Sequence, residues 1–272
     1  MSPSPPLVLT ELTEDGIYVI TINRPKQLNS VNDYVYGEIC TALTFAEKES
    51  KVKVVVVTGS EFRAFCAGAD LQAGFDPYVG PLKSMKGSYL DPVGKFMSQV
   101  IRFNKPLVAA VQGICVGVGA TLLPHCDAVY CVPHATFETP FTKIGVCPEF
   151  CSSVLFPEIL GPTTASEVLF WGRKLSAKEA VQGRLVGEII DAPTREEFLA
   201  KVLAKVRPAL VFPNSGRSMT LFKQLVRSPE RIQYLEATHK KEMDLLDARS
   251  AGPESEAAQG VKFLQSLKKP KL

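Results

Sequence analysis

The chain has 272 residues, of which 46% are hydrophobic and 22% charged, and its formal net charge is +3 at pH 7. This length can bury a substantial core, and the composition is typical of a globular protein. Without a long basic block, and without the roughly 18 to 20 consecutive apolar residues that span a bilayer, the sequence predicts neither a nucleic-acid partner nor a membrane partner.

In chain order, the first half alternates between strand and helix patterns. Strands are predicted at residues 18–22, 52–57, 106–111 and 127–132, and helices at residues 31–43 and 93–103. Residues 72–91 contain Gly, Pro and Tyr without a sustained period, which is typical of a loop or irregular helix over a binding site.

From residue 152 onward the pattern is mainly helical. Helices are predicted at residues 154–160, 163–171, 176–184, 195–206, 215–226, 232–248 and 254–267, with a brief strand at 186–190. The sequence therefore predicts an α/β core over residues 1–206, followed by a helical C-terminal region, residues 207–272, with a role in oligomerisation.

Two glycine-bearing segments stand out, at residues 64–71 (AFCAGADL) and 113–120 (GICVGVGA). Each is predicted to be the end of a buried strand that passes into a tight turn and then a helix. Glycine allows the backbone to turn sharply and to approach a ligand closely. Amides at a helix start lack intrahelical partners, and two of them aimed at one point form an oxyanion hole. The pair predicts chemistry in which negative charge develops on a carbonyl oxygen.

The seven cysteines are scattered, an odd number without a disulfide framework, which favours a reducing intracellular compartment. Cys147 and Cys151 are four residues apart, but no His or second Cys pair is near them in sequence, so core thiols are expected and no metal site.

The C-terminal Pro270-Lys271-Leu272 differs at one residue from the Ser-Lys-Leu peroxisomal signal. We predict a peroxisomal or related location, with cytoplasmic or mitochondrial as alternatives.

Four motifs occur in an order that resembles the crotonase, or enoyl-CoA hydratase/isomerase, superfamily from about residue 8 to 268. They are residues 20–25 (ITINRP), 65–71 (FCAGADL), 105–113 (KPLVAAVQG) and 126–130 (CDAVY). The resemblance implies a crotonase (ClpP-like) spiral of ββα units with a C-terminal helical region, assembled as a homotrimer or a dimer of trimers.

Residues 136–145 and 148–153 most resemble peroxisomal-type Δ3,Δ2-enoyl-CoA isomerases. Those enzymes move a 3,4 double bond of an acyl-CoA to the 2,3 position. The resemblance implies that Ala69 and Val118 donate the oxyanion-hole amides. Glu149 would be the single carboxyl that takes a proton from C2 and returns one to C4, with a pKa raised by apolar neighbours.

The resemblance also implies a substrate-binding set. Ala67, Gly68, Asp70 and Leu71 would line the thioester and pantetheine, Lys26 and Gln27 would lie near the adenosine, and Phe263 would reach the adenine. Asp70 is further expected to cap a helix that starts there. The coenzyme A thioester is the substrate in this scheme, and no cofactor is expected.

Three features set this sequence apart or leave alternatives open. Thr121 and Phe141 occupy the positions of the two hydratase carboxylates, which argues against hydration. Phe150 replaces the family's usual glycine after the glutamate and is expected to narrow the acyl pocket. Dienoyl-CoA isomerisation, thioester hydrolysis and a non-catalytic acyl-CoA-binding scaffold remain alternatives, although a buried Glu149 argues against the scaffold.

Overall fold

A computed structural model describes residues 6–70, 90–250 and 255–267, with side chains 264, 265 and 267 excepted. The larger of its two sheets has the strand order β1-β2-β3-β5-β7-β10 and is parallel apart from the β1–β2 hairpin. These strands are Val8–Leu12, Ile17–Ile22, Val54–Gly59, Leu107–Val111, Ala128–Cys131 and Glu188–Ile189. The central strands β3 and β5 are buried along their whole length and consist mainly of Val and Ala. Such a composition is typical of parallel strands that are covered on both faces.

The smaller sheet is made of short strands, three of which (β4, β6 and β8) follow directly in sequence on β3, β5 and β7 of the larger one. It has the order β4-β6-β8-β9, with strands Ala64–Cys66, Ile114–Val116, Thr136–Glu138 and Leu175–Ser176. Strands β4, β6 and β8 are parallel neighbours. Because parallel strands end at the same edge, the turns that follow β4 and β6 lie side by side.

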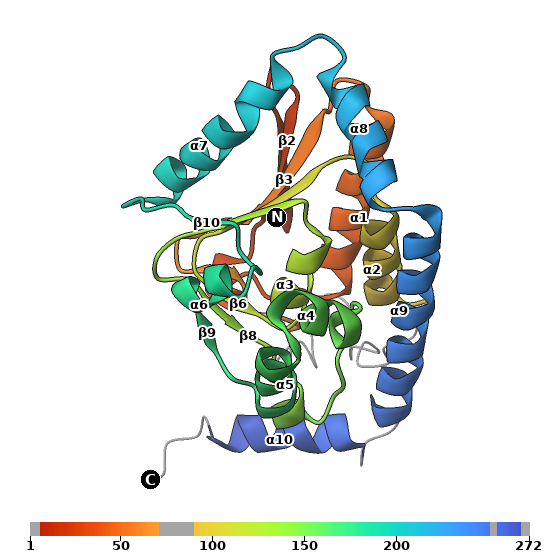
Figure 1. Cartoon of the computed structure of the whole chain (residues 1–272). Helices are drawn as coiled ribbons and strands as arrows, with labels where there is room; N and C mark the ends of the chain where they lie inside the picture. Colours follow the sequence, from red (N-terminus) through yellow and green to blue (C-terminus); the bar gives the residue numbers. More distant parts are fainter. Residues whose placement is uncertain (1–5, 71–89, 251–254, 268–272) are drawn as a thin grey trace, which may run out of the picture.

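Helices α1 (Asp33–Lys48) and α2 (Pro92–Arg102) pack against each other (Figure 1). The Asn32 side chain caps α1 by accepting the Val35 N–H at 3.2 Å. The short α3 (Val118–Thr121) and the 3-10 turn η3 (Leu123–His125) follow β6.

The C-terminal part is helical. Its helices are α4 (Ser152–Leu160), α5 (Pro162–Trp171), α6 (Ala177–Gln182), α7 (Arg195–Val206), α8 (Ser215–Val226), α9 (Pro229–Ser250) and α10 (Glu256–Leu267). Helix α9 runs alongside α2, and α10 packs against the 3-10 turn η4 (Thr142–Ile144) (Figure 1). Among the described residues, none of the helices has the length and apolar character needed to cross a bilayer.

The predicted order of a parallel α/β core followed by helices is confirmed. Strand 186–190 is shorter than predicted, since only Glu188–Ile189 pairs with β7. Strands β1, β8 and β9 were not predicted, whereas β4 and β6 lie in the two segments expected to end a strand at a glycine turn. Residues 72–89 of the predicted loop lie outside the described residues. The division at 206/207 falls where α7 continues directly into the 3-10 turn η5 (Arg207–Leu210), and it stays a prediction.

Candidate active site

The two glycine turns touch each other through their main chains. Cys66 at the end of β4 lies opposite Cys115 of β6 in the register of the sheet, and both cysteines are free thiols. Each glycine turn follows directly after its strand. Gly68 has φ +86° and Gly117 φ +55°. A Cβ on Gly117 would lie 3.6 Å from the Gly68 Cα, and one on Gly68 would lie 3.2 Å from the Val116 carbonyl oxygen. Glycine therefore allows both the backbone conformation and the close approach.

The first turn leaves the Ala69 amide unused. Val31 donates its N–H to the Gly68 carbonyl at 2.9 Å, and its own carbonyl accepts the Asp70 N–H at 2.8 Å. In such a parallel bridge, the residue between the two partners directs its N–H to the opposite side. Within the described part of the chain, the Ala69 N–H has no acceptor.

The second turn leaves the Val118 amide unused. The Gly117 N–H donates to the Glu138 carbonyl at 2.9 Å, and the Gly119 N–H is directed at the Cys66 sulfur. Val118 is the first residue of α3, where an N–H has no partner within the helix. Across residues 6–70, 90–250 and 255–267 the Val118 N–H finds no acceptor.

Glu149 lies in the segment between η4 and α4, where it is half-buried. It is followed by two left-handed residues, Phe150 at φ 56° and Cys151 at φ 61°. Burial raises the pKa of Glu149 to about 8, and the charge of Glu242 on α9 contributes to the rise. A carboxyl with a pKa near neutrality can both take and return a proton.

The charge of Glu149 acts on two groups close to the glycine turns, the Cys66 thiol and the Tyr36 hydroxyl. Burial raises the pKa of the Cys66 thiol to about 12, opposed by the Gly68 and Gly119 amides, and the charge of Glu149 raises it further. Tyr36 of α1 also has a raised pKa, caused by burial first and then by Glu149. Glu149 therefore acts on the sulfur atom at which both turns converge.

The predicted binding residues on the first turn lie close to the segment after β2. Asp70 forms an ion pair with Arg24 at 2.8 Å. Arg24 directly precedes η1 (Pro25–Gln27), in which Lys26 and Gln27 are exposed. The structure thus brings Lys26 and Gln27 into the neighbourhood of Asp70.

The remaining binding residues differ in position. Ala67 N–H donates to the Leu28 carbonyl at 3.0 Å, which ties the first turn to η1. Phe263 is 59% exposed on α10, which packs on η4. Leu71, and the helix that Asp70 was expected to cap, lie outside the described residues.

The two positions that carry carboxylates in hydratases are both buried here. Thr121 in α3 is fully buried, and its Oγ1 has no hydrogen-bond partner among the described residues. Phe141 is 3% exposed. Neither side chain is a carboxylate. These two positions therefore lack the pair of acids that the family resemblance assigns to hydration.

Phe150 packs into the core beside the site. Its ring stacks on His125 with centroids 4.2 Å apart and meets Phe96 edge-on at 5.6 Å. The Phe150 carbonyl also lies 2.8 Å from the His125 Nε2. The expectation that Phe150 narrows the acyl pocket stays a prediction.

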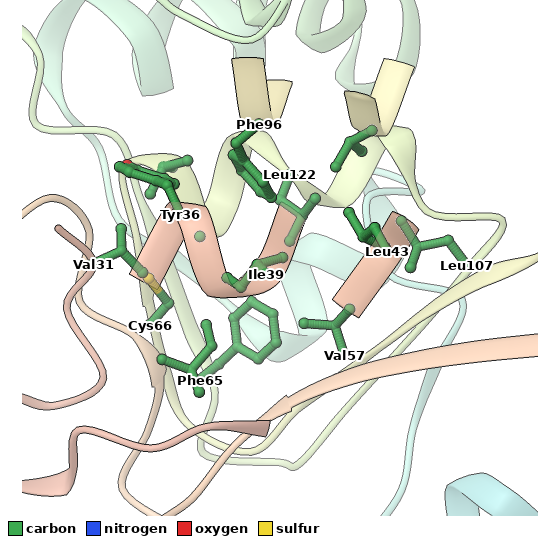
Figure 2. A pocket seen from close by; sticks show the side chains of 14 residues that line it. Val31, Tyr36, Ile39, Leu43, Val57, Phe65, Cys66, Phe96, Leu107 and Leu122 are labelled. Carbon is green, nitrogen blue, oxygen red and sulfur yellow. The ribbon is translucent and has the colours of Figure 1, made fainter. Parts of the chain in front are cut away.

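Side chains of α1 and of the two turns line an apolar cavity (Figure 2). Cys66 and Val118 line one part of it, and Leu43 and Leu107 line another. Its volume is about 20 Å³, room for about one water molecule. In this conformation it is a gap in the packing beside the site and is too small for an acyl chain.

Three residues at the site were not predicted from the sequence: Arg24, Tyr36 and Glu242. Arg24 lies in the quoted ITINRP motif, so its charge next to a turn was a visible signal. Glu242 shares a helical face with the buried Leu235, His239 and Met243, where a charged residue is unusual. Tyr36 gave no signal apart from its place in an amphipathic helix.

A comparison with known families matches the enoyl-CoA hydratase/isomerase family over residues 12–262. The chain belongs to the enoyl-CoA hydratase/isomerase family. Among curated proteins, human enoyl-CoA delta isomerase 2 is 35% identical over 243 residues, which cover 89% of this chain and 59% of the relative. Mouse peroxisomal enoyl-CoA delta isomerase 3 is 34% identical, over 80% of this chain and 67% of the relative. The chain thus spans about three fifths to two thirds of these relatives.

Solved structures also match the whole fold. An enoyl-CoA hydratase/isomerase from Pseudoalteromonas atlantica T6c superposes with a TM-score of 0.84 at 27% identity, covering 98% of this chain and 99% of the other. The crotonase-type fold and the family implied by the sequence motifs are therefore confirmed. The roles assigned to single residues stay predictions.

Proposed function

We propose that this protein is a Δ3,Δ2-enoyl-CoA isomerase that acts on unsaturated fatty acyl-CoA in β-oxidation. One observation carries the proposal: Glu149, a half-buried carboxyl with a pKa raised to about 8, acts on the same sulfur, Cys66, at which two turns with unused amides meet. The names of the human and mouse relatives, both enoyl-CoA delta isomerases, support the reaction type.

In the proposed reaction, the thioester oxygen accepts hydrogen bonds from the Ala69 and Val118 amides. Glu149 takes a proton from C2, and the electron pair of the broken C–H bond forms a double bond between C1 and C2 while the carbonyl π pair moves onto the thioester oxygen, which gives the dienolate. When the carbonyl forms again, the C1–C2 pair becomes the 2,3 double bond, and the 3,4 π pair takes the proton back from Glu149 at C4. Losing one oxyanion donor costs about 2.7–4 kcal/mol in comparable sites.

A single carboxyl is sufficient for this reaction because the proton removed is the proton returned. Hydration would need a second group to activate water, and Thr121 and Phe141 offer none by resemblance. The raised pKa makes the ionised Glu149 a stronger base toward the weakly acidic C2–H. No cofactor takes part, since the coenzyme A thioester is itself the substrate.

The proposed substrate site extends outward from the two turns. The thioester and pantetheine would lie along the first turn, and the adenosine near η1, which the Arg24–Asp70 ion pair joins to that turn. We assign these contacts to Ala67, Gly68, Asp70, Leu71, Lys26, Gln27 and Phe263.

The test is an isomerase assay on the purified protein with 3-enoyl-CoA, following formation of conjugated 2-enoyl-CoA. Glu149→Gln keeps the shape of the side chain but cannot carry a proton between C2 and C4, and we expect a roughly 10²- to 10⁴-fold loss of kcat. Glu196→Gln, on the exposed face of α7 with 77% of its side chain exposed, is the matched control. Full activity of Glu149→Gln would refute the mechanism.

The same assay separates the alternatives. Release of free coenzyme A thiol would identify a thioesterase, and turnover of a dienoyl-CoA alone would identify a dienoyl-CoA isomerase. Binding of acyl-CoA without any turnover would support the non-catalytic scaffold. We expect none of these outcomes, because Glu149 and the amides of Ala69 and Val118 are sufficient for the proposed isomerisation.

We further propose a peroxisomal location and assembly as a homotrimer or dimer of trimers. A relative named as peroxisomal supports the location, and deleting Pro270–Leu272 from a fluorescent fusion should abolish import. Phe212 at 72% and Leu225 and Val226 at 81% exposure, around α8, support burial against another copy. Light scattering should give three or six times the monomer mass, and a monomer would refute the assembly.

A further inference from the structure

Glu242 lies on α9, and its carboxylate is bound to the segment that carries Glu149. The Glu242 residue is 6% exposed. One carboxylate oxygen accepts the Cys151 N–H at 2.6 Å, and the other accepts the Ser153 N–H at 3.0 Å. Both amides belong to the start of α4, where N–H groups lack helical partners and a negative charge is favoured.

The segment held in this way has an unfavourable backbone. Phe150 and Cys151 are consecutive left-handed residues that are not glycine, so the surrounding contacts must keep them there. Helix α9 supplies two more of these contacts: the Cys151 thiol donates to the Leu235 carbonyl at 3.1 Å, and the Cys147 thiol to the Glu242 carbonyl at 3.6 Å. Removing the Glu242 carboxylate would release both amides at the centre of the turn.

We infer that Glu242 is a positioning residue, which fixes the turn that carries Glu149 and faces Glu149 with a buried negative charge. This inference deepens the proposed function and rests on it. It links the C-terminal helical region to the proton chemistry at the two glycine turns, although α9 contributes no group that touches the substrate in the proposed mechanism.

The hydrogen bonds decide which of the two carboxyls ionises first. Burial raises the pKa of Glu242, but the bonds from Ser153 and Cys151 oppose the rise because they stabilise its ionised form. Glu149 has no such hydrogen bonds among the described residues. Glu242 therefore loses its proton first, and its charge then helps Glu149 to keep one.

Other titratable groups near Glu149 stay neutral over the relevant pH range. Burial raises the pKa of Cys147 to about 11 and that of Cys66 to about 12, and it raises the pKa of Tyr36 above its usual value. On α9, burial lowers the pKa of His239, which therefore stays neutral. Besides Glu149 and Glu242, the charged groups that act on the thiols of Cys147 and Cys151 are Arg231, Glu236 and Arg249.

Two substitutions separate the effect of the Glu242 charge from the effect of its hydrogen bonds to Cys151 and Ser153. Glu242→Gln keeps one acceptor oxygen and removes the charge, so the acidic limb of the kcat/KM against pH profile should move to lower pH. Each unit of downward shift raises the ionised fraction of Glu149 about tenfold well below its midpoint. Glu242→Asp keeps the charge but shortens the reach, so kcat should fall while the limb moves much less.

The matched control is Asp244→Asn, which removes an acidic side chain that is 61% exposed on the same helix. Its profile should coincide with that of the unchanged protein. An acidic limb at the same pH in Glu242→Gln and in the unchanged protein would overturn the inference, as would equal shifts in Glu242→Gln and Asp244→Asn.

A titration without substrate keeps this test independent of the isomerase assay. The infrared carboxyl band that disappears in Glu149→Gln reports the ionisation of Glu149 in the resting protein. We expect its midpoint near 8 in the unchanged protein and lower in Glu242→Gln. A midpoint in the ordinary glutamate range in the unchanged protein overturns the inference even where Glu242→Gln does not fold. Absence of isomerase turnover would refute only the proposed function.

Discussion

The Arg24 guanidinium and the Asp70 carboxylate form an ion pair at 2.8 Å that joins the segment after β2 to the turn bearing the Ala69 amide. Both side chains are nearly buried, at 11% and 9% exposure. Arg24 also donates to the Ser30 carbonyl at 2.7 Å. The pair therefore fixes one of the two proposed oxyanion donors from a part of the chain far away in sequence.

Replacing Arg24 by Met should lower the free energy of unfolding by about 3 kcal/mol, since it removes the guanidinium that lies beside the nearly buried Asp70 carboxylate. It should also lower kcat/KM, because the first turn loses an anchor. Denaturant unfolding and the isomerase assay measure the two effects. In the Arg24→Met, Asp70→Asn double variant, part of the stability should return; a strictly additive loss would contradict the ion-pair explanation.

Gly68→Ala should reduce kcat by on the order of tenfold to hundredfold, less than complete loss of one oxyanion donor. An alanine at φ +86° is strained, and its Cβ would press on the Val116 carbonyl oxygen at 3.2 Å, so the neighbouring Ala69 amide must move. Gly37→Ala on α1, where a Cβ meets nothing within 4 Å, is the control. It should add about 0.5–1 kcal/mol of stability and leave kcat unchanged.

Glu149→Gln should make the protein more stable, and increasingly so as the pH rises from about 4.5 to 8. In the unfolded chain Glu149 has the ordinary glutamate pKa of 4.5, whereas burial raises the pKa in the folded chain to about 8. Over this interval the unfolded chain releases a proton that the folded chain keeps, so rising pH favours unfolding. The variant removes this penalty, on the order of a few kcal/mol at pH 8. Equal gains in melting temperature at about pH 5 and pH 8 would contradict the raised pKa.

Phe150→Gly should lower stability by about 2 kcal/mol in spite of relieving a left-handed conformation. The relief is worth about 1–2 kcal/mol, but losing a fully buried aromatic ring costs about 3–5 kcal/mol. Cys151→Gly gains the same relief and loses a smaller side chain, so its stability should change little. Calorimetry of the two variants compares them directly; a more stable Phe150→Gly would show that strain outweighs packing here.

Much of the fold could be predicted from hydrophobic periodicity. Helices α7 and α8 begin and end at the predicted residues, because their apolar positions recur at helical spacing and Thr194 caps α7. The smaller sheet as a unit escaped prediction because β4, β6 and β8 have three residues each, too few for a period to show. Their pairing partners are also distant in sequence.

Those features of the site that depend on residues close together in sequence could be predicted. The free amides at Ala69 and Val118 follow from glycine turns, and burial of Glu149 follows from its apolar neighbours. The Glu242 contact joins residues 91 positions apart in sequence, and the Arg24–Asp70 bond joins residues 46 apart. No local pattern contains such pairs. The left-handed Phe150 was visible only as an unusual residue where the family has glycine.

The hold of α9 on residues 147–153 has a consequence for biosynthesis. Both glycine turns are complete once β6 and α3 have left the ribosome, more than a hundred residues before Glu242 is added. The nascent chain therefore contains both turns while Glu149 still has an ordinary acid strength and an unfixed backbone. In the proposed mechanism, the raised pKa that suits Glu149 to proton transfer is acquired last, when the final helices dock.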